Sequence, residues 1–168
     1  MTAKEFVDGL WSVYDEHQQT GITRCEIEDK LKYVLSNIPA DGHILRNQTA
    51  KILHAYIRDV LEIPDITDEK VLHKATELRD LYDCRTCAYD IMQVYLRGIM
   101  EARYVIQENG MKLFGGGERL TNFELYMIRE RLVASEKKKG TSVGTYLQNY
   151  VHLFDYVSVI VAFLVIKH

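Results

Sequence analysis

The sequence predicts a mainly α-helical fold, organised as a single domain over residues 1–168 with one small β-hairpin near residues 104–114. Two observations carry this prediction. Apolar residues recur along most of the chain at the i, i+3, i+4 and i+7 positions that form one face of a helix. Two of these segments begin with a threonine that is followed three residues later by a glutamate, which is the signature of a capped helix start.

Composition limits the class of protein. The chain has 168 residues, of which 47% are hydrophobic and 27% are charged, and this fits a soluble globular domain with a substantial core. Two prolines and ten glycines argue against long disordered linkers. The net charge of −3 is too small to indicate nucleic-acid binding, and we interpret the run Lys137–Lys139 as a solvated helix end.

Three helices are expected before Pro64. Gly21 separates the first two, and Thr23 with Glu26 forms a capping box at the start of the second. The third begins near Arg46 and ends before Pro64, because a residue that precedes proline avoids the helical region. The inward positions are Phe6, Leu10, Val13 and Tyr14 in the first helix, Ile27, Leu31, Val34 and Leu35 in the second, and Ala50, Leu53, Ile57 and Leu61 in the third.

Two more helices are expected after Pro64, separated by residues 83–86. The first follows the cap donors of residues 65–67, and the second runs from Ala88 until Gly98 closes its last turn. The second has the most regular helical pattern of the chain, so we expect it to be buried. Their apolar positions are Val71, Leu72, Ala75, Leu78 and Tyr82 in the first, and Ala88, Ile91, Met92, Tyr95, Leu96 and Ile99 in the second.

A hairpin and a last capped helix follow. Residues 104–108 and 111–114 flank Asn109-Gly110, the dipeptide that best fits the type I′ turn of a β-hairpin. The three glycines 115–117 are interpreted as a linker, because the lysine and hydroxyl residue of a phosphate-binding loop are missing. Thr121 and Glu124 then form a capping box at the start of the next helix.

The segment from about residue 143 to 166 is the most apolar part of the chain. We interpret it as a buried helix, although its β-branched residues also suit a strand. Asn149, His152 and Asp155 interrupt it, and a bilayer span needs about 20 apolar residues, so no membrane span is expected. If the rest of the chain does not cover this segment, a homodimer is expected to do so, because large apolar patches are rare on monomers.

Cys84 and Cys87 have a spacing that suits a metal or redox site. A zinc ion needs four ligands, and only Cys25 and scattered histidines are available to complete the set. The odd count of three cysteines also argues against a disulfide framework. We therefore interpret Cys84 and Cys87 as two reduced, mostly buried thiols and as weak metal candidates, and we expect no cofactor.

No residue pattern indicates a particular reaction. The acidic pairs Asp68-Glu69 and Asp80/Asp83 are expected at helix ends, where their charges are favourable or simply solvated. Most of the eleven tyrosines are expected to pack in or beside the core, as are Tyr82, Tyr95 and Tyr126. The chain is therefore expected not to be an enzyme.

Three segments share one design. Ile22–Glu26, Ile44–Gln48 and Leu120–Glu124 each place an aliphatic residue first, then a cap or its substitute, and then an acid or amide three positions later. With Asp80-Leu81 before a helix that ends in Gly98-Ile99, this pattern resembles the S-layer homology module of bacterial surface proteins. The similarity covers about residues 20–132.

The resemblance implies a bundle of helix–loop–helix repeats, packed in tandem about a pseudo-threefold axis, that attaches surface proteins to cell-wall polysaccharide. It also implies site residues. The polymer-contacting arginine of the family falls at Arg24 and Arg46, and Asn122 takes its place at the third start. Thr86 stands where the family often has a tryptophan.

We therefore expect a non-catalytic binding or structural module, for attachment to a wall polymer or for self-association. The alternative is an intracellular helical scaffold or regulatory protein that acts through protein–protein contacts. Acidic residues interrupt the apolar pattern of the N-terminus, which has no secretory signal, so the chain as written is expected in the cytoplasm. It is expected at the cell surface if the resemblance holds and the export signal lies outside the sequence.

Overall fold

The computed structural model describes residues 1–17, 22–39, 42–108 and 110–137, and it is mainly helical with one two-stranded antiparallel hairpin. This confirms the predicted fold class. One compact unit spans Met1–Val133, and residues 134–168 are assigned to a second unit. The apolar segment at residues 143–166 lies outside the described residues. None of the described helices is both long enough and apolar enough to cross a membrane.

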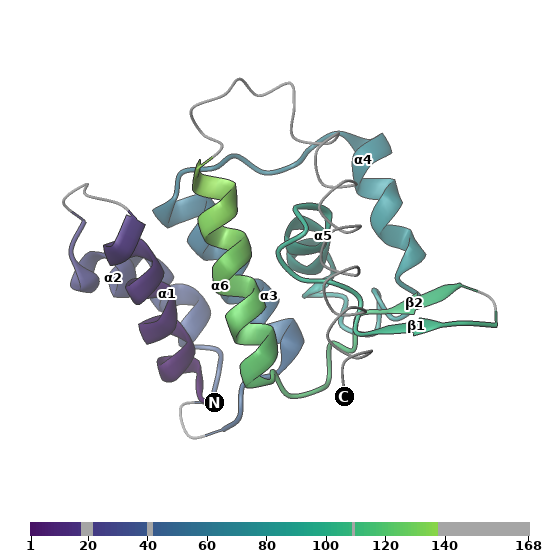
Figure 1. Ribbon diagram of the computed structural model, residues 1–168, viewed down its shortest axis with the longest axis horizontal. Helices are drawn as coiled ribbons and strands as arrows, with labels where there is room; N and C mark the ends of the chain where they lie inside the picture. The colour runs from purple at the N-terminus through teal and green to yellow at the C-terminus, as the bar shows by residue number, and fades with distance from the viewer. Residues whose placement is uncertain (18–21, 40–41, 109, 138–168) are drawn as a thin grey trace, which may run out of the picture. The chain divides into compact units, whose positions relative to one another are not determined.

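The N-terminal half consists of α1 (Ala3–His17), α2 (Arg24–Leu35) and α3 (Arg46–Ala55). Figure 1 shows α1 and α2 on one side of α3, with α4, α5 and the hairpin on the other. The predicted inward positions other than Val13 and Tyr14, whose side chains are not described, meet in one core. Each buried leucine or phenylalanine there contributes about 1.5–3 kcal/mol. Its largest fully buried side chains include Phe6, Leu10, Ile27, Leu31, Leu53, Tyr56 and Ile57.

The third helix ends where proline requires it to end. After Ala55 the chain continues into a single π-helical turn, Tyr56–Val60, and the helical backbone stops at Leu61. Glu62 then adopts a left-handed conformation with φ 55°, two residues before Pro64. The predicted end before Pro64 is confirmed, because the residue before a proline is excluded from the helical region.

The helix expected over residues 71–82 is shorter than predicted. It consists of α4 (Glu69–His73) and a 3₁₀ turn (Lys74–Glu77), after which Leu78 is extended and pairs with Lys112 of the hairpin in a parallel bridge. The pairing satisfies backbone groups that a longer helix would have used. Tyr82 therefore lies outside the helix and is 58% exposed, so the packing expected for it is wrong.

Asp80 fixes this extended segment to the end of the hairpin. Its two carboxylate oxygens accept hydrogen bonds from the backbone N–H groups of Phe114 and Gly115, each at 2.7 Å. Hydrogen bonds to a charged group are stronger than neutral ones. Asp80 is therefore a structural residue and not the solvated charge that was expected.

The fifth helix and the hairpin agree with the sequence prediction. Helix α5 (Ala88–Leu96) is followed by Gly98 in a left-handed conformation with φ 68°. Strands β1 (Tyr104–Ile106) and β2 (Met111–Leu113) pair in register, with Tyr104 opposite Leu113. The glycine of the predicted turn, Gly110, has φ 65°, which favours glycine.

The last described helix, α6 (Asn122–Lys137), packs its first part against α1. Leu125 lies over Gly9, and Arg129 donates a hydrogen bond from Nη2 to the hydroxyl of Ser12 at 3.2 Å. Ile128 and Leu132 are buried, whereas Tyr126 is 58% exposed, so the packing expected for Tyr126 is also wrong.

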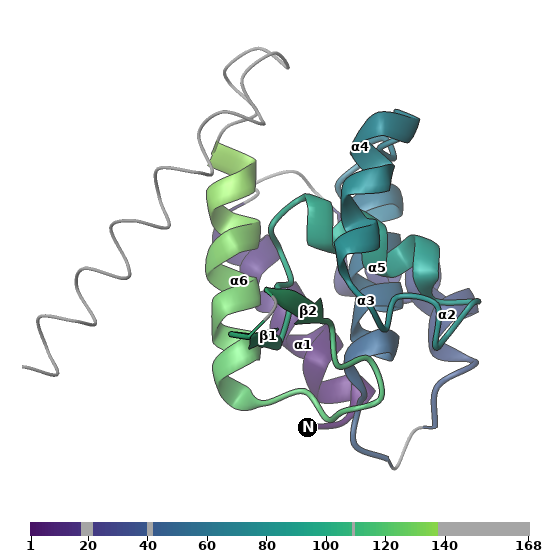
Figure 2. The same ribbon diagram turned by 90° about the vertical axis from the view of Figure 1, so that its right-hand side faces the viewer.

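Three helix starts meet at one end of the compact unit, as the lower part of Figure 2 shows. The backbone N–H of Ile44 donates to the carbonyl of Met1 at 3.0 Å, and the N–H of Leu120 donates to the carbonyl of Ile44 at 3.1 Å. The starts of α1, α3 and α6 are therefore joined by backbone hydrogen bonds. Of the three recurring starts in the sequence, Ile44–Gln48 and Leu120–Glu124 belong to this junction.

The junction also has capping boxes that close each helix start locally. Glu5 and Thr2 exchange hydrogen bonds at α1, and Glu124 and Thr121 do so at α6. At α3, the side chain of Gln48 accepts from the N–H of Leu45 at 2.9 Å. The box at α1 was not singled out in the sequence, although Thr2 and Glu5 have the same spacing as the others.

We predict that Asp80→Ala lowers the free energy of unfolding by about 1–3 kcal/mol, because two partly buried backbone N–H groups lose their acceptor. Urea denaturation followed by circular dichroism measures the loss. Asp83→Ala is the matched control, since Asp83 is exposed and no side-chain hydrogen bond ties it to the hairpin. Equal losses in the two variants would show that the Asp80 contacts contribute nothing specific.

Candidate functional site

A groove of about 440 Å³ opens between the C-terminal end of α2, one face of α3 and the loop that precedes α5. Apolar side chains, Val34, Ile38 and Leu45 among them, share its lining with polar ones. The polar side chains are of several kinds. They include the amides of Asn37, Asn47 and Gln48, the cations of Lys51 and Arg58, the ring of Tyr33 and the carboxylate of Asp90. A surface of this kind offers both hydrogen-bond donors and acceptors to a ligand.

Helix α3 contributes Asn47, Gln48 and Lys51 to the groove, and its faces have different roles. Ala50, Leu53 and Ile57 point into the core, as the helical spacing predicts. Gln48 and Lys51, three residues apart, lie together on the groove face. Lys51 forms no ion pair with any other described residue, so its charge is available to a ligand.

A disulfide between Cys84 and Cys87 forms part of the groove wall. The interpretation of these residues as two reduced thiols is therefore wrong. The reason is local: the backbone N–H of Cys87 donates to the carbonyl of Cys84 at 2.9 Å, and this tight turn brings the two side chains together.

Cys25 is the remaining thiol, and it is exposed on α2. Among the described residues no three His, Cys, Asp or Glu side chains are grouped so as to hold a metal ion.

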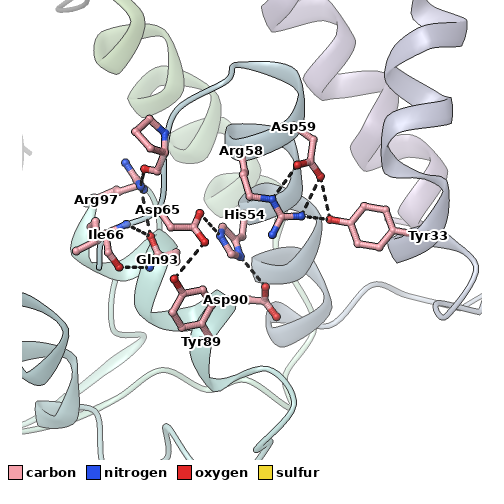
Figure 3. A network of polar contacts seen from close by, with 11 residues as sticks. Tyr33, His54, Arg58, Asp59, Asp65, Ile66, Tyr89, Asp90, Gln93 and Arg97 are labelled. Carbon is pink, nitrogen blue, oxygen red and sulfur yellow. Dashed lines mark hydrogen bonds and ion pairs between the residues drawn. The ribbon is translucent and has the colours of Figure 1, made fainter. Parts of the chain in front are cut away.

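Tyr33 is held at the edge of the groove by a charged pair. Its hydroxyl donates to Asp59 at 3.0 Å and accepts from Nη2 of Arg58 at 2.6 Å (Figure 3). Arg58 also donates from Nε to Asp59 at 2.8 Å, and this hydrogen bond lowers the pKa of the Asp59 carboxyl. Burial and the neighbouring Asp59 raise the pKa of Tyr33. The phenol is therefore neutral, and its ring is fixed with 51% of the residue exposed.

His54 lies behind the groove, between two carboxylates. Its Nδ1 is 2.7 Å from Oδ1 of Asp90, and its Nε2 is 2.9 Å from Oδ1 of Asp65 (Figure 3). Burial lowers the pKa of His54, but the hydrogen bonds and charges of Asp90 and Asp65 outweigh it, so the pKa lies above its ordinary value of 6.5. Each ring nitrogen faces a carboxylate oxygen, and both nitrogens can donate a hydrogen bond only when the ring is a protonated imidazolium.

The polar network continues from His54 to the end of α5. Tyr89 donates to the second oxygen of Asp65 at 3.1 Å, and its ring meets His54 edge to face with 5.5 Å between the ring centroids. The amide of Gln93 accepts from the N–H of Ile66 and donates to its carbonyl, both at 2.9 Å. The network thereby ties α3, the segment after Pro64 and α5 into one rigid support for the groove.

His54 is not placed to act as a general base. Both nitrogens of His54 are engaged by carboxylates, so neither has a free lone pair with which to take a proton from a nucleophile. The groove combines amides, cations, a carboxylate, a hydroxyl and a phenol ring with apolar side chains, and polar groups placed among apolar ones can orient a ligand through hydrogen bonds.

The structure separates the residues that the sequence proposed as binding residues. Arg24 is exposed at the start of α2, where it pairs with Asp8 and Glu28. Asn122 is exposed at the first position of α6. Neither residue lines the groove, and Arg46 is only 3% exposed.

Arg46 is used inside the protein. Its Nε donates to the carbonyl of Phe114 at 2.8 Å, its Nη2 donates to the carbonyl of Glu101 at 2.6 Å, and its Nη1 pairs with Glu124. The guanidinium also lies over the Phe114 ring, 4.7 Å from the centroid. The guanidinium therefore has almost no exposed surface with which to make the polymer contact that was expected, because three other segments of the chain occupy its donors.

The sequence reasoning missed several residues that form the site. His54 had a detectable signal, since it lies four residues after Ala50 on a face that is otherwise apolar. Lys51, Arg58 and Asp90 had none, because a charged residue on the outer face of a helix is normally just solvated. Their proximity follows from the packing of α3 against α5.

A comparison of the chain with protein-family models, curated proteins and solved structures finds no match. The function of the groove is therefore argued from its own chemistry.

The raised pKa of His54 predicts how stability depends on pH. Its contribution to the free energy of unfolding is complete below pH 6.5 and is lost as the pH rises through the higher pKa of the folded state. Urea denaturation between pH 6 and 9 should therefore show a smaller decline in His54→Gln than in the wild-type chain. His73→Gln changes an exposed histidine and should keep the wild-type decline. Parallel curves for all three proteins would contradict the imidazolium assignment.

We also predict that Arg46→Ala costs about 3–5 kcal/mol of unfolding free energy, because it leaves Glu124 without its buried cation. Arg24→Ala is the matched control. The side chain of Arg24 is 45% exposed and its ion pairs are screened by water, so this variant should unfold almost like the wild type. Denaturant midpoints measure both, and similar small effects would show that Arg46 is not a structural centre.

Proposed function

We propose that the chain is a non-catalytic module that binds a carbohydrate polymer of the bacterial cell wall in the groove of α2, α3 and the disulfide loop. The observation that carries this proposal is the lining of the groove: three amides, two cations and an exposed tyrosine ring in one open channel. Sugar hydroxyl groups both donate and accept hydrogen bonds, and an amide has groups for both roles. The Asn37 nitrogen and the Gln48 oxygen already bond to the backbone, so we assign the acceptor role to the Asn37 oxygen and the donor role to the Gln48 nitrogen. The ring of Tyr33 offers a flat apolar surface on which a sugar ring can stack.

The resemblance to S-layer homology modules supports the same ligand class. Thr86, which stands at the position of the family's frequent tryptophan, lines the groove. The groove therefore contains the position at which the family often has a tryptophan. Thr86 has no aromatic ring, and Tyr33 supplies one elsewhere in the same groove. Arg46 is buried and Arg24 lies outside the groove, so we assign the cationic contacts with the polymer to Lys51 and Arg58.

The disulfide supports a location outside the cytoplasm. Disulfides persist in oxidising compartments and at cell surfaces, whereas cytosolic thiols are kept reduced. The Cys84–Cys87 bond therefore favours the cell-surface location that the resemblance implies over the cytoplasmic one.

One observation favours the alternative function of a scaffold that acts through protein contacts. The outer strand β1 exposes three consecutive apolar residues, Tyr104, Val105 and Ile106, and Phe123 at the start of α6 is 71% exposed. Exposed apolar side chains of this size are frequent at protein interfaces. Self-association through the segment at residues 143–166 remains a prediction, because that segment lies outside the described residues.

Co-sedimentation with purified wall sacculi tests the polymer proposal. We expect the wild-type chain to pellet, and Lys51→Gln to bind about tenfold more weakly through the loss of a charge-assisted contact. Lys74→Gln is the control, because Lys74 is an exposed lysine that does not line the groove. Tyr33→Ala should also weaken binding, and Tyr82→Ala, which changes an equally exposed tyrosine outside the groove, should not.

Two outcomes contradict the proposal. If the wild-type chain stays in the supernatant, the groove does not hold wall polymer and the scaffold function is favoured. If the chain pellets but the groove variants and their controls bind equally, the polymer contacts another surface.

A further inference from the structure

The Cys84–Cys87 disulfide is placed where an external molecule can reach it. Both cysteines line the groove, and they differ in burial: Cys84 is partly exposed, whereas Cys87 is only 4% exposed. Arg85 and Thr86, the two residues between them, are exposed. Cys84 is therefore the more accessible of the two residues, and Cys87 belongs to the core.

The turn that holds the two sulfurs does not depend on the bond between them. The hydrogen bond from the N–H of Cys87 to the carbonyl of Cys84 closes the turn, and the N–H of Ile91 donates to the carbonyl of Cys87 at 2.9 Å. Leu81 and Ile91 anchor the two ends of the loop in the core. The turn therefore has backbone support besides the disulfide, and we expect the two sulfurs to stay within reach of each other when the bond is broken.

The position of Cys87 favours it as a leaving thiolate. It is the residue immediately before the nine-residue helix α5, at the N-cap position. Negative charge is stabilised at a helix N-terminus, and thiolates in this position are formed more easily than on a free chain. Cys84 has a different neighbour, the hydroxyl of Thr86, which is 3.6 Å from its sulfur and can hydrogen-bond to a thiolate there.

We propose that Cys84 and Cys87 form a thiol–disulfide exchange site whose substrates are small-molecule or peptide thiols that enter the groove. An incoming thiolate attacks Sγ of Cys84, the bond between Cys84 and Cys87 breaks, and its electron pair leaves on Cys87. The product is a mixed disulfide between the substrate and Cys84. This activity goes beyond the proposed polymer binding and does not depend on it.

The mixed disulfide has two balanced fates. The Cys87 thiolate attacks Sγ of Cys84, which expels the substrate thiolate and restores the original bond. A second substrate thiolate attacks the substrate sulfur instead, which gives a substrate disulfide and leaves Cys84 as a thiolate. In the second case two substrate thiols are oxidised, two electrons pass to the cysteine pair, and the two protons of the substrate thiols end on Cys84 and Cys87.

The groove gives the site a way to select its substrate. Amides of Asn47 and Gln48 and the free charge of Lys51 lie in the same channel as the disulfide. They can bind the backbone or the carboxylates of a peptide thiol while its sulfur approaches Cys84. Glutathione, a small thiol with amide and carboxylate groups, is therefore a suitable probe.

The experiment uses the full chain with Cys25→Ser, which removes the exposed third thiol. The oxidised protein is mixed with reduced glutathione, the reaction is stopped with acid, and mass spectrometry of peptides identifies the modified cysteine. The reference is a linear oxidised peptide of residues 80–90. We expect glutathione on Cys84, with exchange about tenfold faster than in the peptide.

Attack mainly at Cys87, or exchange slower than in the peptide, would overturn the proposal, because the fold would then protect the bond. The two single variants Cys84→Ala and Cys87→Ala give an independent measurement with oxidised glutathione. The thiol of Cys84 should form the mixed disulfide faster than the thiol of Cys87, and the reverse order would also overturn it. No polysaccharide is present, so a negative result leaves polymer binding untouched.

Discussion

The buried guanidinium of Arg46 is the interaction on which the arrangement of the chain depends. It joins the start of α3 to Glu101, Phe114 and Glu124, which lie 55, 68 and 78 residues further along the chain. Each contact is a hydrogen bond with a desolvated charge, so removal of any partner leaves an uncompensated polar group in the core. The backbone bonds between helix starts and the Asp80 contacts to Phe114 and Gly115 add to the same junction. The junction sets the orientation of α3, and α3 carries the groove.

A single helix thus connects stability with the proposed binding site. The first residue of α3, Arg46, is committed to the junction, and His54 near its end is committed to the Asp65 and Asp90 carboxylates. Between them, the outer face presents Gln48 and Lys51 to the groove. The charges of Arg46 and His54, which hold the fold, are therefore paired and buried. Of the two cations proposed for a ligand, Lys51 forms no ion pair with a described residue, whereas Arg58 is paired with Asp59. This division agrees with a binding module whose site is preorganised by its support and is not assembled by the ligand.

The groove combines two kinds of chemistry. Its amides, cations and tyrosine suit a polar polymer, and its wall contains a disulfide with one accessible sulfur. Oxidising surroundings that preserve such a bond are the surroundings in which wall polymers occur. The two proposals are compatible because they use neighbouring surfaces: Lys51 and Tyr33 on the helices, and Cys84 on the loop before α5.

The sequence by itself determined the local structure. Helix starts, the hairpin and the end of α3 before Pro64 follow from residues only a few positions apart, and capping, turn and proline effects act over that distance. Only the tertiary structure decided what the polar side chains do. Arg46 and Arg24 have the same place in their sequence motifs, yet one is buried and the other is exposed. The reason is that burial, ion pairing and the groove arise from contacts between residues tens of positions apart, which a local pattern does not encode.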